Sequence, residues 1–437
     1  MTHTQFSRTQ LRRAVLSSYL GSVIEYYDFL LYATASAVVF NKIFFSNLDP
    51  LAGTVASFGT LATGYFARPL GGILFGHFGD RIGRKKMLVL SMALMGIGSA
   101  LIGLLPTYSQ IGVWAPILLV FLRVVQGIAV GGEWGGAVLM SAEHASSRRG
   151  LWAGFTNAGA PSGMVLSTLV LALSAAVTGE QEFLARGWRI PFLLSIVLLA
   201  IGLFVRARVT ETPVFTEAAA GKPAAPPLLQ VLRHHPRNLA LSVGVGFGAF
   251  VAQGTLTTFV ISYAVQAGFP RSTVLNALTL SSAAAVFGII GFSALSDRLG
   301  RRPVVLGGAA AMAVWAFLLF PLINSRSTVM LTLAVVAGQG IVHAAMYGPL
   351  AALYAELFTT RARYTGASLG YQISGIGAGL APVVFASVLA GGGSTMTIAI
   401  IIAAGCLLTV GSILVLRETA TDDLAGVPEV TAVTAGR

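Results

Sequence analysis

The sequence predicts an all-α membrane protein of twelve transmembrane helices, arranged as two pseudo-symmetric six-helix bundles. Charged residues make up only 10% of the 437 residues and the mean hydropathy is +0.80, whereas a soluble domain has about 25% charged residues. Twelve apolar stretches reach the length of about 18 residues that an α-helix needs to cross a bilayer. A basic stretch around Asp80 is repeated around Asp297, 217 residues later, so the repeat spans half of the chain. Such a repeat is typical of membrane proteins built from two related halves.

The twelve apolar stretches follow one another along the chain with short polar connections. They are residues 14–40, 52–76, 87–107, 113–142, 152–176, 188–206, 239–266, 273–294, 304–323, 329–356, 365–390 and 395–416. The first stretch follows Arg12 and Arg13, as the apolar part of a signal peptide does. Because Glu25 and Asp28 lie within it, we interpret it as the first transmembrane helix and not as a cleavable signal.

The positions of Lys and Arg predict the orientation of the chain. With the N-terminus in the cytoplasm, 21 of the 28 Lys and Arg residues fall on that side and five on the other, while Arg68 and Arg123 lie inside helices. Cytoplasmic loops are enriched in Lys and Arg. We therefore expect a multi-pass protein of a bacterial-type inner membrane with both ends in the cytoplasm. Loop charge also explains the net charge of +12 without a nucleic-acid partner.

A polar segment divides the helices into two groups of six. Residues 207–238 are the longest part without an apolar stretch, and they include the sequence AAAGKPAAPP at 218–227, which is typical of a flexible or extended linker. The predicted organisation is an N-terminal bundle over 1–206, a cytoplasmic linker over 207–238, and a C-terminal bundle with a short cytoplasmic tail over 239–437.

Several motifs resemble the major facilitator superfamily and, within it, the metabolite:proton symporter branch. The first basic turn, GHFGDRIGRKK at 76–86, recurs as SALSDRLGRR at 293–302, with Ser293 in place of Gly76. A second pair aligns Gln126-Gly127-Ile128 and Glu143 with Gln339-Gly340-Ile341 and Glu356. The finer matches are EYYDF at 25–29, RPLGG at 68–72, RVVQG at 123–127, GGEW at 131–134, WRIPF at 188–192, ETPVF at 211–215 and RYTG at 363–366.

This resemblance implies a proton-coupled symporter that imports a small polar metabolite by alternating access. The branch includes carriers for shikimate, 2-oxoglutarate, citrate and zwitterionic osmolytes, and we expect an organic acid, shikimate-like or another carboxylate. A zwitterionic osmolyte is an alternative, although the tail from Ala420 lacks the heptads of the best-known osmolyte carriers. A proton-coupled antiporter that exports its substrate is another, because Gly154, Gly159, Pro161 and Gly163 partly match the motif of drug:proton antiporters.

Five charged residues lie inside the predicted membrane helices, each at a cost of at least about 2.5–3.5 kcal/mol. They are Glu25, Asp28, Arg68, Arg123 and Glu133, all in the first half. The aligned second-half positions of Arg123 and Glu133 are Val336 and Met346, so charge is not required by the shared fold. A carboxylate stays ionised beside an arginine and takes up a proton more readily when desolvated without one.

We therefore predict that proton coupling involves Asp28, Glu25, Arg123 and Glu133. A static ion pair between Asp28 and Arg123 is the structural alternative, and sodium would also suit the carboxylates. Arg68 is expected either to bind an anionic substrate or to bridge to Glu133 or backbone carbonyls. The predicted substrate contacts are Arg123, Tyr32, Gln126, Trp134, Gln253, His343, Tyr347, Tyr371, Gln372 and Arg68; packing and ordinary hydrogen bonding are the alternatives for the aromatic residues and His343.

The two basic turns are predicted to form a cytoplasmic gate. An aspartate can accept hydrogen bonds from the N-terminus of a helix in the opposite half, and the arginines can pair with Glu143 and Glu356. The alternative is that these positive residues serve only to orient the chain. The predicted gate residues are Asp80, Arg81, Gly83, Arg84, Asp297, Arg298, Gly300, Arg301, Glu143 and Glu356.

No catalytic motif is visible, so the chain is not expected to be an enzyme. It has no Walker A sequence and no metal-spaced His/Cys cluster. The single cysteine, Cys406, excludes an internal disulfide. We expect no cofactor, with a proton gradient as the energy source. The expected partners are a small-molecule substrate, the proton and the lipid bilayer, the protein being a monomer that binds no nucleic acid and no metal.

Overall fold

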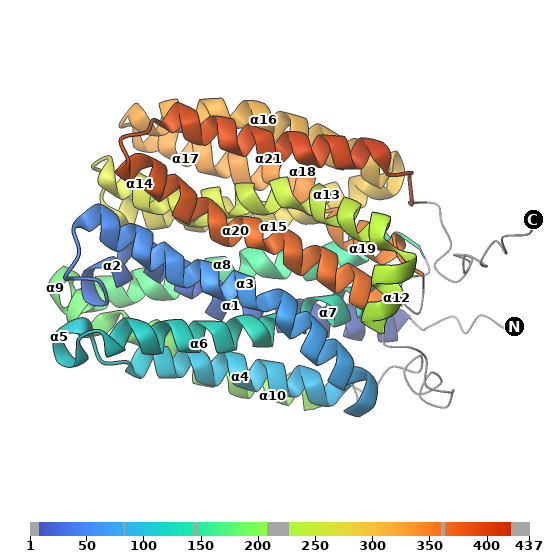
Figure 1. Cartoon of the computed structure of the whole chain (residues 1–437), viewed down its shortest axis with the longest axis horizontal. Coiled ribbons are helices and arrows are strands. Elements are labelled where there is room, and N and C mark those ends of the chain that lie inside the picture. The colour runs from blue at the N-terminus through green and yellow to red at the C-terminus, as the bar shows by residue number, and fades with distance from the viewer. Residues whose placement is uncertain are drawn as a thin grey trace, which may run out of the picture.

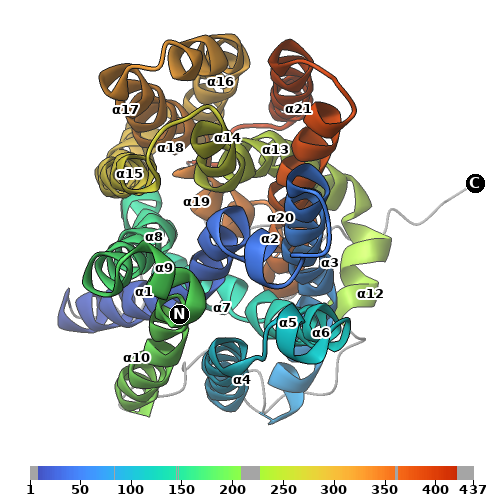
Figure 2. The same cartoon turned by 90° about the vertical axis from the view of Figure 1, so that its left-hand side faces the viewer.

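The computed structural model describes residues 8–82, 84–143, 145, 147–207, 227–359 and 363–420. Within these residues every regular element is a helix, and long helices run nearly parallel along one axis (Figure 1). Figure 2 shows the bundle end-on, with the helices of the two halves side by side. α1 begins and α21 ends at the same end of the bundle, which also holds the turn between α15 and α16. We call this the basic end.

The first half contains six spans, with three short helices, α2, α5 and α9, on the connections. Its elements are α1 Arg8–Val38, α2 Phe40–Ile43, α3 Pro50–Ile82, α4 Arg84–Leu104, α5 Tyr108–Ile111, α6 Trp114–Gly131, α7 Trp134–Glu143, α8 Arg149–Thr178, α9 Glu180–Glu182, η1 Phe183–Gly187 and α10 Arg189–Ala207. The fourth span is made of α6 and α7, which are separated at Gly132 and Glu133. The sixth span begins with the π-helical turn η1 and continues as α10.

The second half repeats the six spans, two of them interrupted by π-helical turns. Its elements are α12 Pro227–His234, α13 Pro236–Gly254, η2 Thr255–Phe259, α14 Val260–Gln266, α15 Arg271–Leu299, α16 Arg301–Asn324, α17 Thr328–Ala337, η3 Gly338–His343, α18 Ala344–Tyr347, α19 Leu350–Glu356, α20 Arg363–Ala390 and α21 Thr395–Val415. The turns η2 and η3 were not predicted from the sequence, and π-helical turns frequently mark functional positions.

The length and composition of the helices fit a membrane. Ten described spans are long and apolar enough to cross a bilayer, and α1 and α3, of 31 and 33 residues, are the two remaining spans. Large apolar side chains such as Val177 and Phe287 are 78% and 77% exposed, as expected of groups that face lipid and not water. The predicted all-α class with twelve transmembrane helices is confirmed.

Two seams join the halves along their length, α8 against α15 and α3 against α20. The predicted linker differs from the expectation in its described part, because residues 227–234 form helix α12 and α13 begins at Pro236. In α12, Val231 is buried and Arg233 is exposed. This part of the predicted linker is therefore an amphipathic helix. Residues 208–226 lie outside the described part of the chain.

Candidate functional site

Three of the predicted carboxylates surround one small cavity in the first half. Glu25, Asp28 and Glu133 line it together with Met92 and Gly96 of α4, and each of the three acids is at most 5% exposed. Glu25 and Asp28 are one helical turn apart on α1, as their spacing predicts. Glu133 reaches the cavity from the break between α6 and α7.

Serine hydroxyls position two of these carboxylates. Ser195 of α10 donates a hydrogen bond to Asp28 Oδ1, and Ser91 Oγ of α4 lies 3.4 Å from Glu133 Oε2. A buried hydroxyl donor favours the ionised form of its partner over the protonated one. In the part of the chain that is described, no set of three or more His, Cys, Asp or Glu residues could hold a metal ion.

Arg123 does not form the direct ion pair with Asp28 that the sequence analysis gave as the structural alternative to coupling. Its guanidinium carbon lies 3.8 Å from the ring centre of Phe29 and 4.1 Å from that of Tyr32, so it rests on two aromatic rings of α1. Its Nη1 donates to Gln126 Oε1 at 3.2 Å, and Gln126 Nε2 donates to Ser99 at 2.8 Å. Arg123 and Asp28 therefore act on each other through their charges, across a gap, and not through a shared hydrogen bond.

Arg68 of α3 approaches the same ring. Its guanidinium carbon lies 4.5 Å from the ring centre of Phe29 and 5.1 Å from that of Tyr65. Arg68 and Arg123 are 1% and 0% exposed, and for both residues Nε and Nη2 have no hydrogen-bond partner among the described residues. The predicted bridge from Arg68 to Glu133 is not formed. Two buried cations thus share one phenylalanine and present unused N–H donors.

Aromatic residues tie the two halves together beside the arginines. The indole of Trp134 in α7 stacks on the ring of Tyr371 in α20, with centroids 3.6 Å apart and planes at 10°. The Tyr371 hydroxyl lies 2.6 Å from that of Tyr26 in α1 and 2.5 Å from that of Tyr347 in α18. Asn157 of α8 accepts from Trp134 Nε1 at 3.2 Å and donates to the Tyr347 carbonyl at 3.0 Å.

The sequence had indicated part of this group. Trp134, Tyr347 and Tyr371 were predicted as substrate contacts, whereas Tyr26 and Asn157 were missed. Tyr26 stands inside the EYYDF motif, so the motif itself contained the signal. Tyr32 hydrogen-bonds to Thr60 Oγ1 at 2.6 Å, which leaves its ring, and not its hydroxyl, facing Arg123.

A second buried cavity collects the polar residues of the second half. Gln253, Thr257, Gln339, His343 and Tyr347 line it against Leu30 of α1 and Pro161 of α8. Its polar lining comes from the interrupted seventh and tenth spans. It therefore lies between the halves.

Two acceptors in this second cavity are unused. His343 Nε2 lies 3.1 Å from the Ala249 carbonyl oxygen, so Nε2 carries the hydrogen and Nδ1 is an acceptor. Neither His343 Nδ1 nor Gln253 Oε1 has a hydrogen-bond partner among the described residues. Gln339 is occupied by Ser281 and Ser282, and Gln372 Nε2 donates across the seam to the Gly131 carbonyl at 3.1 Å.

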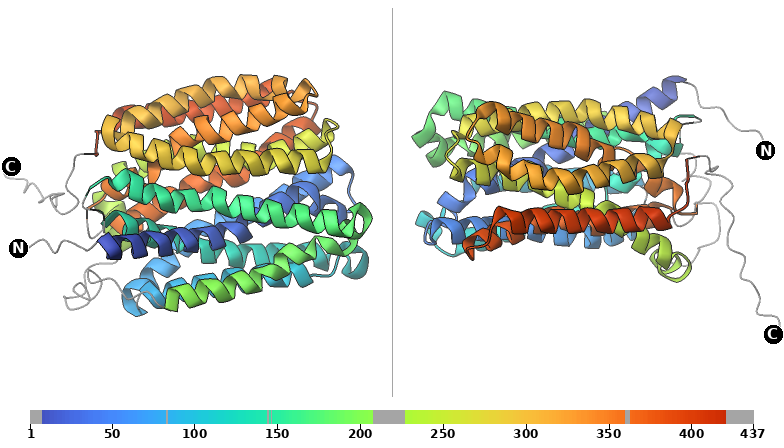
Figure 3. Two further views of the ribbon diagram at one scale, coloured as in Figure 1. Left: turned by 180° about the vertical axis from the view of Figure 1, so that it is seen from behind. Right: turned by 90° about the horizontal axis from the view of Figure 1, so that it is seen from above.

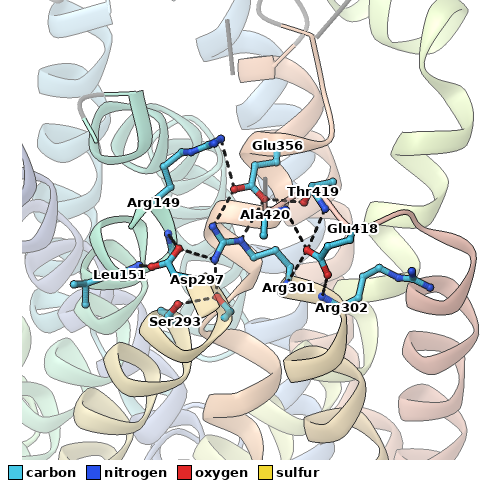
Figure 4. A network of polar contacts seen from close by, with 12 residues as sticks. Arg149, Leu151, Ser293, Asp297, Arg301, Arg302, Glu356, Glu418, Thr419 and Ala420 are labelled. Carbon is cyan, nitrogen blue, oxygen red and sulfur yellow. Dashed lines mark hydrogen bonds and ion pairs between the residues drawn. The ribbon is translucent and has the colours of Figure 1, made fainter. Parts of the chain in front are cut away.

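A separate polar network lies at the basic end (Figure 4). Both oxygens of Asp297, near the end of α15, accept from the start of α8, from Gly150 N at 2.8 Å and Leu151 N at 2.9 Å. Arg301 donates to Asp297 at 2.8 Å and pairs with Glu356 at 3.1 Å. The two backbone bonds to Asp297 and the ion pair of Arg149 in α8 with Glu356, at 3.8 Å, connect the second half with the first. The backbone bonds place the positive end of the α8 dipole on a carboxylate.

Glycines allow this close contact. A Cβ atom on Gly150 would lie 2.6 Å from the Ser293 carbonyl oxygen and 2.8 Å from Asp297 Oδ1. Gly300 joins α15 to α16 with φ +98°, a conformation that other residues rarely adopt. Arg298, also predicted here, is exposed and forms no hydrogen bond or ion pair with the described residues.

The segment after α21 completes the network, which the sequence had not predicted. Glu418 accepts from Arg301 N at 2.8 Å and Arg302 N at 3.1 Å and so caps α16, while Thr419 donates to Glu356 at 2.7 Å. Partial burial acts to raise the pKa of Glu418, but four backbone N–H donors outweigh it and lower the pKa below the ordinary value. The sequence did contain a sign that this segment matters, because Glu418-Thr419 repeats the Glu211-Thr212 that follows the sixth span.

The matching turn of the first half cannot be compared. Gly83 and the side chains of Asp80, Arg81, Arg84 and Glu143 lie outside the described part of the chain.

The structure has twelve spans in two halves, and a polar network joins these halves at one end. Polar cavities lie between and within the halves. Together these features define a membrane transporter and not an enzyme. The chain belongs to the Major Facilitator Superfamily, whose sequence profile it matches over residues 19–382 and 271–433. It is 38% identical to a shikimate transporter of Escherichia coli (strain K12) over 420 residues, covering 94% of this chain and 96% of that protein.

Other relatives and a solved structure agree with this assignment. The chain is 34% identical to a glycine betaine/proline/ectoine/pipecolic acid transporter of Dickeya dadantii (strain 3937), covering 86% of this chain and 77% of that protein. The fold is similar to the xylose transporter XylE from E. coli in a partially occluded inward-open conformation, with a TM-score of 0.72, 20% identity and coverage of 95% and 100%.

Proposed function

We propose that this transporter is a proton-coupled symporter that imports a small organic acid across a bacterial inner membrane. The observation that carries the proposal is the pair of buried arginines, Arg68 and Arg123, on the ring of Phe29. Their unused N–H donors are costly in a buried site, because an unpaired charged donor loses its hydration without compensation. A carboxylate supplies charge and acceptors together and is the group that a guanidinium binds best.

The second-half cavity adds a preference for a hydroxylated acid. His343 Nδ1 and Gln253 Oε1 are acceptors without a partner among the described residues, so they suit donor groups such as the hydroxyls of a substrate. Tyr347 lines this cavity, and its hydroxyl connects through Tyr371 and Tyr26 towards the arginines. The similarity to a shikimate transporter supports the same class, an acid that carries several hydroxyl groups.

The carboxylate cavity supports proton coupling. Counting Arg68 and Arg123 against Glu25, Asp28 and Glu133 gives a net charge of −1 when all are ionised. A substrate anion would bring this to −2 in a medium of low dielectric, which is unfavourable. A proton taken up with the anion restores −1, so the two are bound together. Asp28 is the proposed proton site, with Glu25 and Glu133 beside it.

Alternating access follows from the network at the basic end, which we assign to the cytoplasmic side together with both chain ends. Asp297 and Glu356 of the second half contact Gly150, Leu151 and Arg149 of the first half there, and these contacts must break for that side to open. The excess of Lys and Arg in the same loops supports the orientation.

Transport by the purified protein in liposomes tests the proposal. We expect shikimate to accumulate when the compartment of origin is acidic, with protons arriving in the receiving compartment, and an uncoupler to abolish accumulation. Arg68→Gln should lose uptake, and Arg298→Gln, an exposed arginine outside both cavities, should keep it. Uptake of betaine but of no carboxylic acid would favour the osmolyte class, and proton flow against substrate flow would favour an antiporter; either would contradict the proposal.

A further inference from the structure

A third hollow lies on the outer face of the bundle and has no part in the function proposed above. Its volume is about 450 Å³, within the range of about 300–1,000 Å³ that small-ligand sites occupy. It is lined by α1 and α8 of the first half, and by Ile290 of α15. The view from behind shows these three helices side by side (Figure 3).

The lining is apolar apart from one cation at the basic end. Trp152 and Phe155 form one wall, with ring centroids 6.0 Å apart and planes at 26°, and Leu16 is 57% exposed opposite them. The Tyr19 hydroxyl is already paired with Ser162 at 2.8 Å. Arg12 is exposed and forms no hydrogen bond or ion pair with the described residues.

The position of these groups matches the layers of a bilayer. Arg12 and Trp152 each lie about one turn from the helix ends Arg8 and Arg149, at the level where basic and aromatic side chains meet lipid headgroups. Tyr19 lies seven residues further along α1, about 10 Å deeper at 1.5 Å per residue. The hollow thus runs from a cation at the headgroup level into the acyl region.

We propose that this hollow is a binding site for an anionic phospholipid of the leaflet at the basic end. The acyl chain lies on Trp152, Phe155 and Ile290, and the headgroup phosphate pairs with Arg12. A soluble metabolite would find a single charge and no unpaired polar group within the hollow. Because Ile290 belongs to the second half, the bound lipid touches both halves of the transporter.

Lipid binding to the purified full-length protein tests this site. Native mass spectrometry in mixed micelles should show more bound phosphatidylglycerol than phosphatidylcholine. The Arg12→Gln variant should lose about fivefold of that preference, the contribution of one basic residue near an anionic surface. Arg148→Gln removes an exposed arginine at the same end that does not line the hollow, and it should leave the preference unchanged.

A second variant tests the apolar part. Ile290→Trp fills the hollow and should lower the binding of both lipids, while inorganic phosphate alone should produce no adduct on any variant. An unchanged preference in Arg12→Gln, or an equal loss in Arg148→Gln, would overturn the proposal. Lipid binding that appears only after residues 2–7 are removed would also overturn it, because that segment would then be the occupant.

Discussion

Replacing Asp297 by Asn should open the basic end, because this carboxylate joins the two halves. Asp297 accepts from Gly150 N and Leu151 N at the start of α8 and from Arg301 in its own half. Asn keeps the shape of the side chain and one acceptor oxygen, but it loses the charge and turns an N–H group towards the N–H groups of α8 or towards Arg301. Arg301 loses one charged partner but retains the other, Glu356, so it stays paired within the second half.

The magnitude follows from the two bonds between Asp297 and α8. A hydrogen bond to a charged group contributes about 1.5–3 kcal/mol and a neutral one about 0.5–1.5 kcal/mol. Asn can keep one bond to α8 as a neutral bond, which weakens by about 1 kcal/mol, and it loses the other, so the shift towards the open state is at least about 2 kcal/mol. Since 1.4 kcal/mol corresponds to a factor of ten, the open population should rise at least about 30-fold.

Thiol labelling measures this population, because the chain has a single cysteine. Cys406 is fully buried, so it gives a low background and reports unfolding if it becomes reactive. Ser293 is also buried, next to Gly150 and Gly154 of α8, and its Oγ has no hydrogen-bond partner among the described residues. Ser293→Cys therefore places a thiol beneath the contact, where reagent reaches it only when the halves separate.

The control is Arg298→Gln on the same turn, which also removes one charge but no contact with the described residues. We expect Ser293→Cys to be labelled at least about 30-fold faster with Asp297→Asn and at the parental rate with Arg298→Gln. Equal rates in the parent and in Asp297→Asn would refute the reasoning, as would a similar acceleration in the control.

Three further outcomes follow from the site. Asp28→Asn should abolish accumulation driven by a pH gradient yet retain substrate counterflow, and wild-type accumulation in proteoliposomes would exclude its coupling role. Arg123→Gln should eliminate uptake, and Arg123→Lys should keep a small part of it, because Lys lacks the planar fork of the guanidinium. Val336→Ala, at the aligned position of the second half, should cause only a mild loss of uptake. Equal losses of uptake at 123 and 336 would assign both helices to packing. Because its pKa is lowered from 4.5, ionised Glu418 contributes stability at any pH above 4.5 and loses this contribution only as the pH falls through the lowered pKa. Glu418→Gln should therefore reduce the thermal unfolding temperature equally at pH 5.5 and pH 8. A smaller reduction at pH 5.5 than at pH 8 would contradict this.

Composition and length were enough to predict the class of fold, but not its local irregularities. Low charge and twelve long apolar stretches leave few alternatives to a helical membrane protein. The π-helical turn η3, which carries His343, has no such signal, because its sequence GQGIVH contains no pattern that separates a π-helical turn from an α-helix. Helix α12 was missed for the opposite reason: its amphipathic pattern is short and follows a Pro-rich linker.

Within the site, the sequence identified residues better than it identified their partners. Spacing alone places Glu25 and Asp28 on one face, and the structure brings both to one cavity. The expected pair of Asp28 and Arg123 depended on how α1 and α6 rotate against each other. The actual packing places Phe29 under the guanidinium and Gln126 beside it, and such contacts across helices leave no trace in sequence spacing.

The capping of α16 by Glu418 bears on how the chain can be shortened or fused. The last transmembrane helix ends at Val415, and trimming to that point would look harmless from hydropathy. It would remove the carboxylate that holds the first amides of α16 and the hydroxyl of Thr419 on Glu356. A purification tag or fluorescent partner is therefore best attached beyond Ala420, where the network is left whole.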